Sequence, residues 1–133
     1  LRLSIPENSC VTVDPNHLTQ VLTNLFSNAI KFTDQGSISL QCVMESMNYR
    51  IRISDTGIGI GENEVQHIFK PFRQAHEGLS RAKGGIGLGL SICKEMIEMW
   101  NGSIVVNSTS GVGSVFSFTI PIPGKERPLS TSI

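Results

Sequence analysis

Residues 15–32 form an apolar stripe at helical spacing, and any fold of this chain has to cover that stripe. Asp14 is a good N-cap residue and Pro15 suits the first helical position, so a helix is predicted over residues 15–32. At about 100° per residue, one broad face collects the side chains of Leu18, Val21, Leu22, Leu25, Phe26, Ala29, Ile30 and Phe32. Such a face requires a second layer of structure.

The second layer is predicted to be a sheet of short strands. Residues 37–45 and 49–55 read as a hairpin, in which Ile51 and Ile53 point inward by period-2 alternation. The other predicted elements are strands at 2–5, 10–13, 103–108 and 114–121, a short helix at 63–69, and a helix at 88–100 that Asn101-Gly102 ends. Together they predict an α+β two-layer sandwich, with one mixed sheet and helices on one face.

Length and charge narrow the possible functions. The 133 residues, 39% hydrophobic and 17% charged, are typical of one soluble globular domain. The 11 basic and 11 acidic residues cancel without a basic run, so no nucleic-acid partner is expected. With no signal peptide and no apolar stretch of membrane length, we expect a cytoplasmic piece without direct membrane contact. The scattered Cys10, Cys42 and Cys93 are expected to be reduced core residues without a metal.

The chain begins without Met, which favours a piece of a longer protein and leaves open whether the parent is anchored in a membrane. Residues 1–123 are expected to form the folded domain. Residues 124–133 are expected to be a flexible tail or linker.

Polar residues follow one edge of the predicted first helix. Asn24, Asn28 and Lys31 are spaced i, i+4, i+7, and two Asn one turn apart are unusual helix formers. This pattern indicates a binding role. Two simpler interpretations stay open: Asn24 could bond to nearby loops, and Lys31 could be a plain surface cation.

Asp55 follows the inward phase of its strand, where a carboxylate is unfavourable unless something donates hydrogen bonds to it. The glycines of residues 56–61 then end the strand, and Asp55 capping that turn is the simpler alternative. Residues 73–87 read as a mobile loop, and the glycine run 85–89 before a helix would place backbone N–H groups at phosphates. A flexible connector is the alternative for that run.

Five motifs in this order resemble those of the ATP-binding catalytic domain of histidine protein kinases, in the GHKL ATPase superfamily. The resemblance covers about residues 10–121. It rests on Gln20–Thr33 (N box), Asp55–Ile60 (first glycine box), Ile68–Phe72 (F box), Gly85–Leu90 (second glycine box) and Ser110–Phe116 (closing glycine box). The form Phe69-x-Pro71-Phe72-x-Gln74 is most similar to hybrid, phosphorelay-type sensor kinases.

The resemblance implies a Bergerat-type sheet with a mobile ATP lid, and transfer of the γ-phosphoryl of ATP to a histidine. That acceptor would lie on a separate dimerisation helical hairpin of the same protein, with a receiver domain or response regulator downstream. ATP and magnesium are the implied cofactors, with magnesium at Asn28, phosphate contacts and catalysis at Asn24, Lys31 and Gln74, and adenine recognition at Asp55. Further nucleotide contacts are implied for Phe32, Gly57, Gly59, Ile60, Phe72, Gly85, Ile86, Gly87, Leu88, Gly89, Leu90 and Ser114.

One position departs from the wider superfamily. Members that hydrolyse ATP, such as DNA gyrase, carry a Glu one turn before the magnesium Asn, and Asn24 stands there in this chain. Loss of that base suits a histidine nucleophile. None of His17, His67 and His76 has an acceptor context, so the chain is expected to hold only the donor half. A degenerate nucleotide-binding signalling module and a protein-serine kinase of the same fold remain the alternatives.

Overall fold

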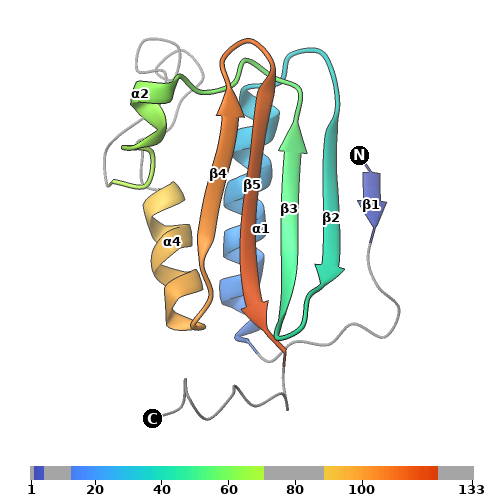
Figure 1. The fold of residues 1–133 in the computed structure, drawn as a ribbon, viewed down its shortest axis with the longest axis vertical. Coiled ribbons are helices and arrows are strands. Elements are labelled where there is room, and N and C mark those ends of the chain that lie inside the picture. The colour runs from blue at the N-terminus through green and yellow to red at the C-terminus, as the bar shows by residue number, and fades with distance from the viewer. Residues whose placement is uncertain (1, 5–12, 71–88, 123–133) are drawn as a thin grey trace.

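The structure, a computed structural model, describes residues 2–4, 13–70 and 89–122. Its strands form one five-stranded sheet in the order β1-β2-β3-β5-β4 (Figure 1). They are β1 (Arg2–Ser4), β2 (Ile38–Met44), β3 (Asn48–Asp55), β4 (Ile104–Thr109) and β5 (Gly113–Pro121). β1 pairs with β2 in parallel and the other pairs are antiparallel, which confirms the mixed sheet.

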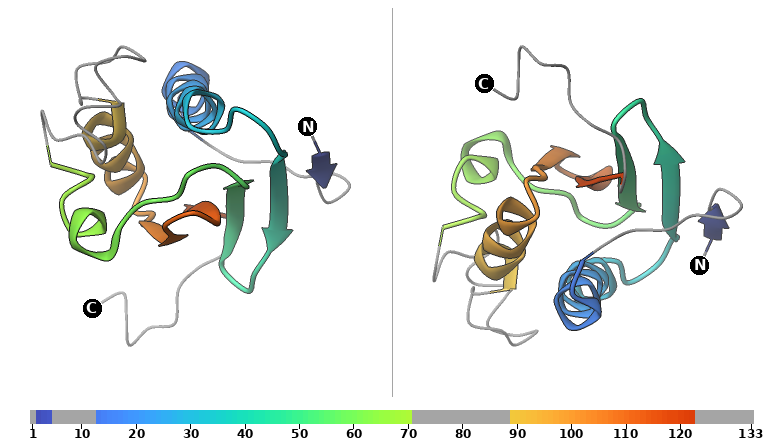
Figure 2. Two further views of the ribbon diagram at one scale, coloured as in Figure 1. Left: turned by 90° about the horizontal axis from the view of Figure 1, so that it is seen from above. Right: turned by 90° about the horizontal axis from the view of Figure 1, so that it is seen from below.

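Two helices, α1 (Pro15–Lys31) and α4 (Gly89–Met99), pack side by side on one face of this sheet (Figure 2). The short helix α2 (Glu62–Val65) lies near β4. The core fills the space between the helices and the sheet, with Phe118, Ile53 and Leu25 among its most deeply buried side chains. The predicted α+β sandwich with helices on one face is therefore confirmed.

Helix α1 begins as the sequence predicts. The Asp14 carboxylate accepts a hydrogen bond from the Asn16 N–H (2.8 Å), and Pro15 takes the first helical position. Val21 and Leu25 of the apolar face are buried, but the expectation for Ile30 was wrong, because its side chain is 64% exposed. At about 100° per residue, position 30 lies about 180° around the helix from Val21, outside the covered part of the face.

Helix α4 ends in a Schellman motif. Asn101 adopts the left-handed conformation (φ 61°), the Gly102 N–H donates to the Ile97 carbonyl (3.0 Å) and the Asn101 N–H donates to the Glu98 carbonyl (3.0 Å). The predicted stop at Asn101-Gly102 is thus confirmed, with Asn101 in the position that glycine more often takes. Cys93 and Ile97 point from this helix into the core and are fully buried.

The predicted short helix at 63–69 is too long. α2 ends at Val65, and turns with three-residue spacing follow, in which His67 N–H donates to Glu64 (2.9 Å) and Lys70 N–H to His67 (3.0 Å). Phe69 then packs edge-on against Phe116, with ring centroids 6.4 Å apart, so it is a core aromatic.

The remaining predicted segments fall partly or wholly outside the described residues. Val13, the described residue of the strand expected at 10–13, is not in a strand, and the loop at 73–87 and the tail at 124–133 lie outside. Among the described helices, none is long and apolar enough to cross a membrane. Cys42 and Cys93 are free thiols.

Candidate functional site

The end of β3 places Asp55 in a half-buried position beside several hydrogen-bond donors. Its carboxylate accepts from the Gly57 N–H (2.9 Å), so Asp55 does cap the turn that follows it. Burial raises the pKa of the Asp55 carboxyl, against the opposing effect of the Gly57 and Ser114 backbone N–H groups and the Thr33 hydroxyl. The Thr33 oxygen is itself buried and lacks a hydrogen bond of good geometry. A partly desolvated carboxylate is left that still has room to accept a further hydrogen bond.

Ser114, which faces Asp55 across the β3–β5 ladder, belongs to a compact hydroxyl cluster. Ser108 of β4 holds this cluster together: its Oγ lies 2.8 Å from the Ser114 Oγ, 2.7 Å from the Ile60 backbone N and 2.9 Å from the Gly113 carbonyl oxygen. We call Asp55, Gly57, Ser108 and Ser114 the Asp55 corner. It joins the end of β3 to the paired strands β4 and β5, which lie far from β3 in the sequence.

Ser108 was not singled out from the sequence. A signal for it existed, because Ser108 continues the inward phase of Ile104 and Val106 on β4, as Asp55 does on β3. A polar residue on the buried side of a strand needs a partner.

The glycines at 57 and 59 have a structural reason for being glycine. A Cβ at Gly57 would collide with the Phe32 carbonyl, and one at Gly59 (φ 72°) with the Thr109 carbonyl. The atoms that crowd both positions are backbone oxygens of the protein, so glycine is needed there whether or not a nucleotide is bound. The contact of these two glycines with a nucleotide stays a prediction, as does that of Ile60, whose side chain is buried in the core.

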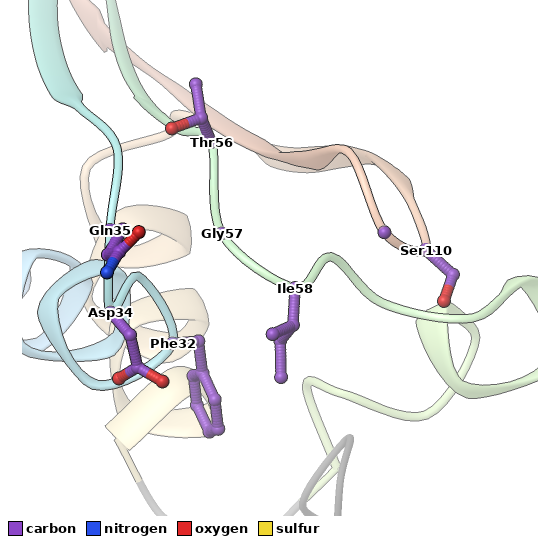
Figure 3. Close-up of a pocket in the computed structure, with 8 residues that line it drawn as sticks. Phe32, Asp34, Gln35, Thr56, Gly57, Ile58 and Ser110 are labelled. Carbon is purple, nitrogen blue, oxygen red and sulfur yellow. The ribbon is translucent and has the colours of Figure 1, made fainter.

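A hollow of about 520 Å³ lies beside the corner (Figure 3). It is lined by Phe32, Asp34, Gln35, Thr56, Gly57, Ile58, Ser110 and Gly111. The side chains of Phe32 and Ile58 stand on its two sides, with the Asp34 carboxylate next to Phe32. Of the residues predicted to contact a nucleotide, this hollow includes Phe32 and Gly57 but not Asp55.

Asn24, Asn28 and Lys31 lie half-buried along α1, and we call them the α1 stripe. The Asn24 amide oxygen accepts from Gln20 (2.9 Å), and its nitrogen donates to the Gly89 carbonyl at the start of α4 (3.2 Å). Asn24 therefore bonds within its own helix and to the start of α4, and its contact with a phosphate stays a prediction. The Asn28 side chain, in contrast, makes no hydrogen bond with any part of the chain that the structure describes.

Comparison with known proteins identifies the family. The family model described as "Histidine kinase-, DNA gyrase B-, and HSP90-like ATPase" matches residues 13–124. The chain belongs to this ATPase family. It is 46% identical over 120 residues to the sensor histidine kinase RcsC of Salmonella typhimurium, covering 90% of this chain and 13% of that relative.

Solved structures narrow the assignment within the ATPase family. The catalytic domain of histidine kinase ThkA matches with a TM-score of 0.76 and 32% identity, over 90% of this chain and 77% of that one. Full-length ShkA in complex with AMPPNP matches with a TM-score of 0.76 and 27% identity, over 96% of this chain and 27% of that one. This chain is thus a histidine kinase catalytic domain, and it spans 13% of the length of the relative RcsC.

The α1 stripe fits the magnesium ion that this ATPase family implies. Asn28 offers a neutral carboxamide oxygen that no described residue occupies. The described residues contain no group of three His, Cys, Asp or Glu side chains that could form a metal cage. Mg²⁺ commonly takes one or two protein oxygens and completes its shell with phosphates and water. Asn28 would hold it in that way.

The predicted phosphate-side residues are only partly described. Gly89 begins α4, and Leu90 packs half-buried against the core. The other candidates lie outside the described residues: Phe72, Gln74, Gly85, Ile86, Gly87 and Leu88.

Proposed function

We propose that this domain binds ATP with magnesium and delivers the γ-phosphoryl group to a histidine on a separate helical hairpin of its parent protein. The observation that carries the proposal is the Asp55 carboxylate, half-buried at a strand end and held by the Gly57 N–H with acceptor capacity left over. The exocyclic amine of adenine is a donor that would satisfy it. The related protein ShkA was solved with AMPPNP, an ATP analogue, which supports the same ligand class.

The remaining roles follow from the α1 stripe. Asn28 would hold magnesium, which would supply positive charge to offset that of the phosphates. Lys31, Asn24 and Gln74 would contact the phosphates. No Asp or Glu occurs in α1, so this helix lacks a carboxylate base that would activate water beside Asn28, which favours transfer to an imidazole. Catalysis would then consist mainly of positioning and electrostatic stabilisation.

The wider assignment rests on the relatives. We propose that the parent is a sensor kinase of the hybrid, phosphorelay type, with a receiver domain or response regulator as the next acceptor. The cytoplasmic location expected from the sequence belongs to the same proposal.

Isothermal titration with AMPPNP and with its guanine counterpart, each with and without magnesium, tests the binding step. We expect adenine-selective binding that magnesium strengthens. Transfer is then measured from labelled ATP to a separately supplied acceptor hairpin. Tight binding without transfer would support the degenerate signalling module, transfer to serine would support the serine kinase, and no binding under any condition would overturn the proposal.

A further inference from the structure

The Ser108 hydroxyl makes more close polar contacts than an ordinary surface serine. A serine hydroxyl has one hydrogen to donate and two lone pairs to accept with. Among the described residues, three polar atoms lie within 2.9 Å of its Oγ: the Ile60 N, the Gly113 O and the Ser114 Oγ. Its hydrogen-bonding capacity is therefore filled.

Only one arrangement of hydrogens makes all three contacts hydrogen bonds. The Ile60 N–H can only donate, so it uses one lone pair of Ser108. The Gly113 carbonyl can only accept, so it takes the single hydrogen of Ser108. The contact at 2.8 Å with Ser114 then requires the Ser114 hydroxyl to donate and Ser108 to accept.

This direction fixes what Ser114 can offer to a ligand. Ser114 is 6% exposed, and its hydrogen is turned away toward β4 while its oxygen keeps acceptor capacity. Its backbone N–H and that of Gly57 already face the Asp55 carboxyl. The corner therefore presents acceptors to an incoming base.

We propose that Ser108 is a positioning residue that sets the base selectivity of the nucleotide site by fixing the hydrogen of Ser114. The inference rests on the proposed ATP binding. With Ser108 in place, the corner accepts from the amino group of adenine and meets the carbonyl oxygen of guanine with acceptors only. Without it, the Ser114 hydroxyl is free either to donate to Asp55, competing with the adenine amine, or to donate to a guanine carbonyl. Both changes reduce the preference for adenine.

The experiment compares Ser108→Ala with wild type by titrating AMPPNP and its guanine counterpart with magnesium. We expect the ratio of the two dissociation constants to fall by roughly fivefold, within the range expected for one neutral hydrogen bond. Ser108→Thr keeps a hydroxyl and should keep the ratio. Ser103→Ala removes a hydroxyl that contacts Thr119 at the other end of β4 and serves as the matched control.

The route through Ser114 is tested with the Ser114→Ala and Ser108→Ala/Ser114→Ala variants. The effect of Ser108→Ala on selectivity should vanish when the Ser114 hydroxyl is absent. An equal loss of affinity for both nucleotides, or an unchanged effect in the Ser114→Ala background, would overturn the inference and leave ATP binding intact. A wild-type domain that binds neither nucleotide would instead remove the proposed function, and the inference with it.

Discussion

The two sides of the candidate site are built in opposite ways. In the Asp55 corner, groups from β3, from the loop that follows it, from β4 and from β5 bond to one another at 2.7 to 2.9 Å. In the α1 stripe, Asn24 is bound to Gln20 and to Gly89, whereas Asn28 finds no partner among the described residues. The donors of the corner are paired before a ligand arrives and Asp55 keeps only acceptor capacity, whereas the Asn28 carboxamide has no hydrogen-bond partner among the described residues.

This difference suggests that the Asp55 corner serves base selectivity and that the α1 stripe serves the metal ion and the phosphates. A corner whose hydrogens are fixed by the sheet can discriminate between bases at little reorganisation cost. The Asn28 carboxamide, which has no partner among the described residues, suits a cation that arrives together with the nucleotide. Variants on the two sides should therefore fail in different ways.

The largest effect is expected when the backbone of the corner is disturbed. Gly57→Ala should lower the free energy of unfolding by about 3 kcal/mol or more, because the new Cβ meets the Phe32 carbonyl. Gly61→Ala is the matched control, since nothing lies within 4 Å of its Cβ position, and it should cost about 1 kcal/mol or less. Urea unfolding of both variants measures the difference. Equal stability of the two would show that the loop adjusts freely.

The carboxylate itself should affect binding and not folding. Asp55→Asn can still accept from the Gly57 N–H, but it then turns an amide NH₂ toward the adenine amine. We expect binding of AMPPNP to weaken roughly 100-fold, as for loss of a charged hydrogen bond, with thermal unfolding near that of wild type. If the variant instead melts early while its folded fraction binds normally, Asp55 serves only the turn.

On the α1 stripe, substitutions of Asn28 and Asn24 should have different effects. Asn28→Ala should remove about tenfold of the magnesium-dependent affinity and leave stability unchanged. Asn24→Ala should cost about 1 kcal/mol of stability, because it loses the contact with Gly89. Titration with and without magnesium, together with urea unfolding, tests both. An equal loss of affinity with and without magnesium would exclude Asn28 as the metal ligand.

The smallest effect concerns Cys93, which lies behind the stripe. Burial raises the pKa of its thiol to about 11 from an ordinary value of 9.0, while the Asn24 side chain opposes the shift. The unfolded chain therefore loses this proton at lower pH than the folded one, so the stability is present below pH 9 and is lost as the pH rises toward 11. Between about pH 8 and about pH 10 the loss should be about 1 kcal/mol. In Cys93→Ala that part of the pH dependence should disappear from unfolding curves; an unaltered slope would assign it to other groups.

Local signals in the sequence were sufficient for much of this fold. Asp14 and Pro15 mark the start of α1 because a cap depends on neighbouring residues alone. The period-2 phase of β3 places Asp55 on the same side as Ile51 and Ile53, as its pairing with Ser114 confirms. The same reasoning failed at Ile30, because periodicity gives the direction of a face but not how far its neighbours cover it.

The period-2 phase of β4 turns Ser108 inward, but the partners of its hydroxyl could not be predicted in this way. Ser108 belongs to no motif, and its role depends on the pairing of β4 with β5 and on the loop that carries Ile60 returning to the same place. The reason for glycine at position 57 is equally non-local, since the crowding atom belongs to the end of α1. The role of Ser108 and the need for glycine at position 57 both depend on contacts between segments that are distant in the sequence.

The register of β3 and β5 places Pro121 opposite Asn48, at the end of the sheet far from Asp55. The Ile122 N–H donates to Met47 at that same end (3.0 Å), where α1 also begins (Figure 1). The Asn48–Pro121 pair and the Met47–Ile122 hydrogen bond both lie away from the Asp55 corner. Fluorescent labels attached near Met47 or Ile122 would leave the nucleotide site uncovered. Distance measurements with such labels could therefore follow the movement of this domain, as one rigid piece, relative to other domains of a longer protein.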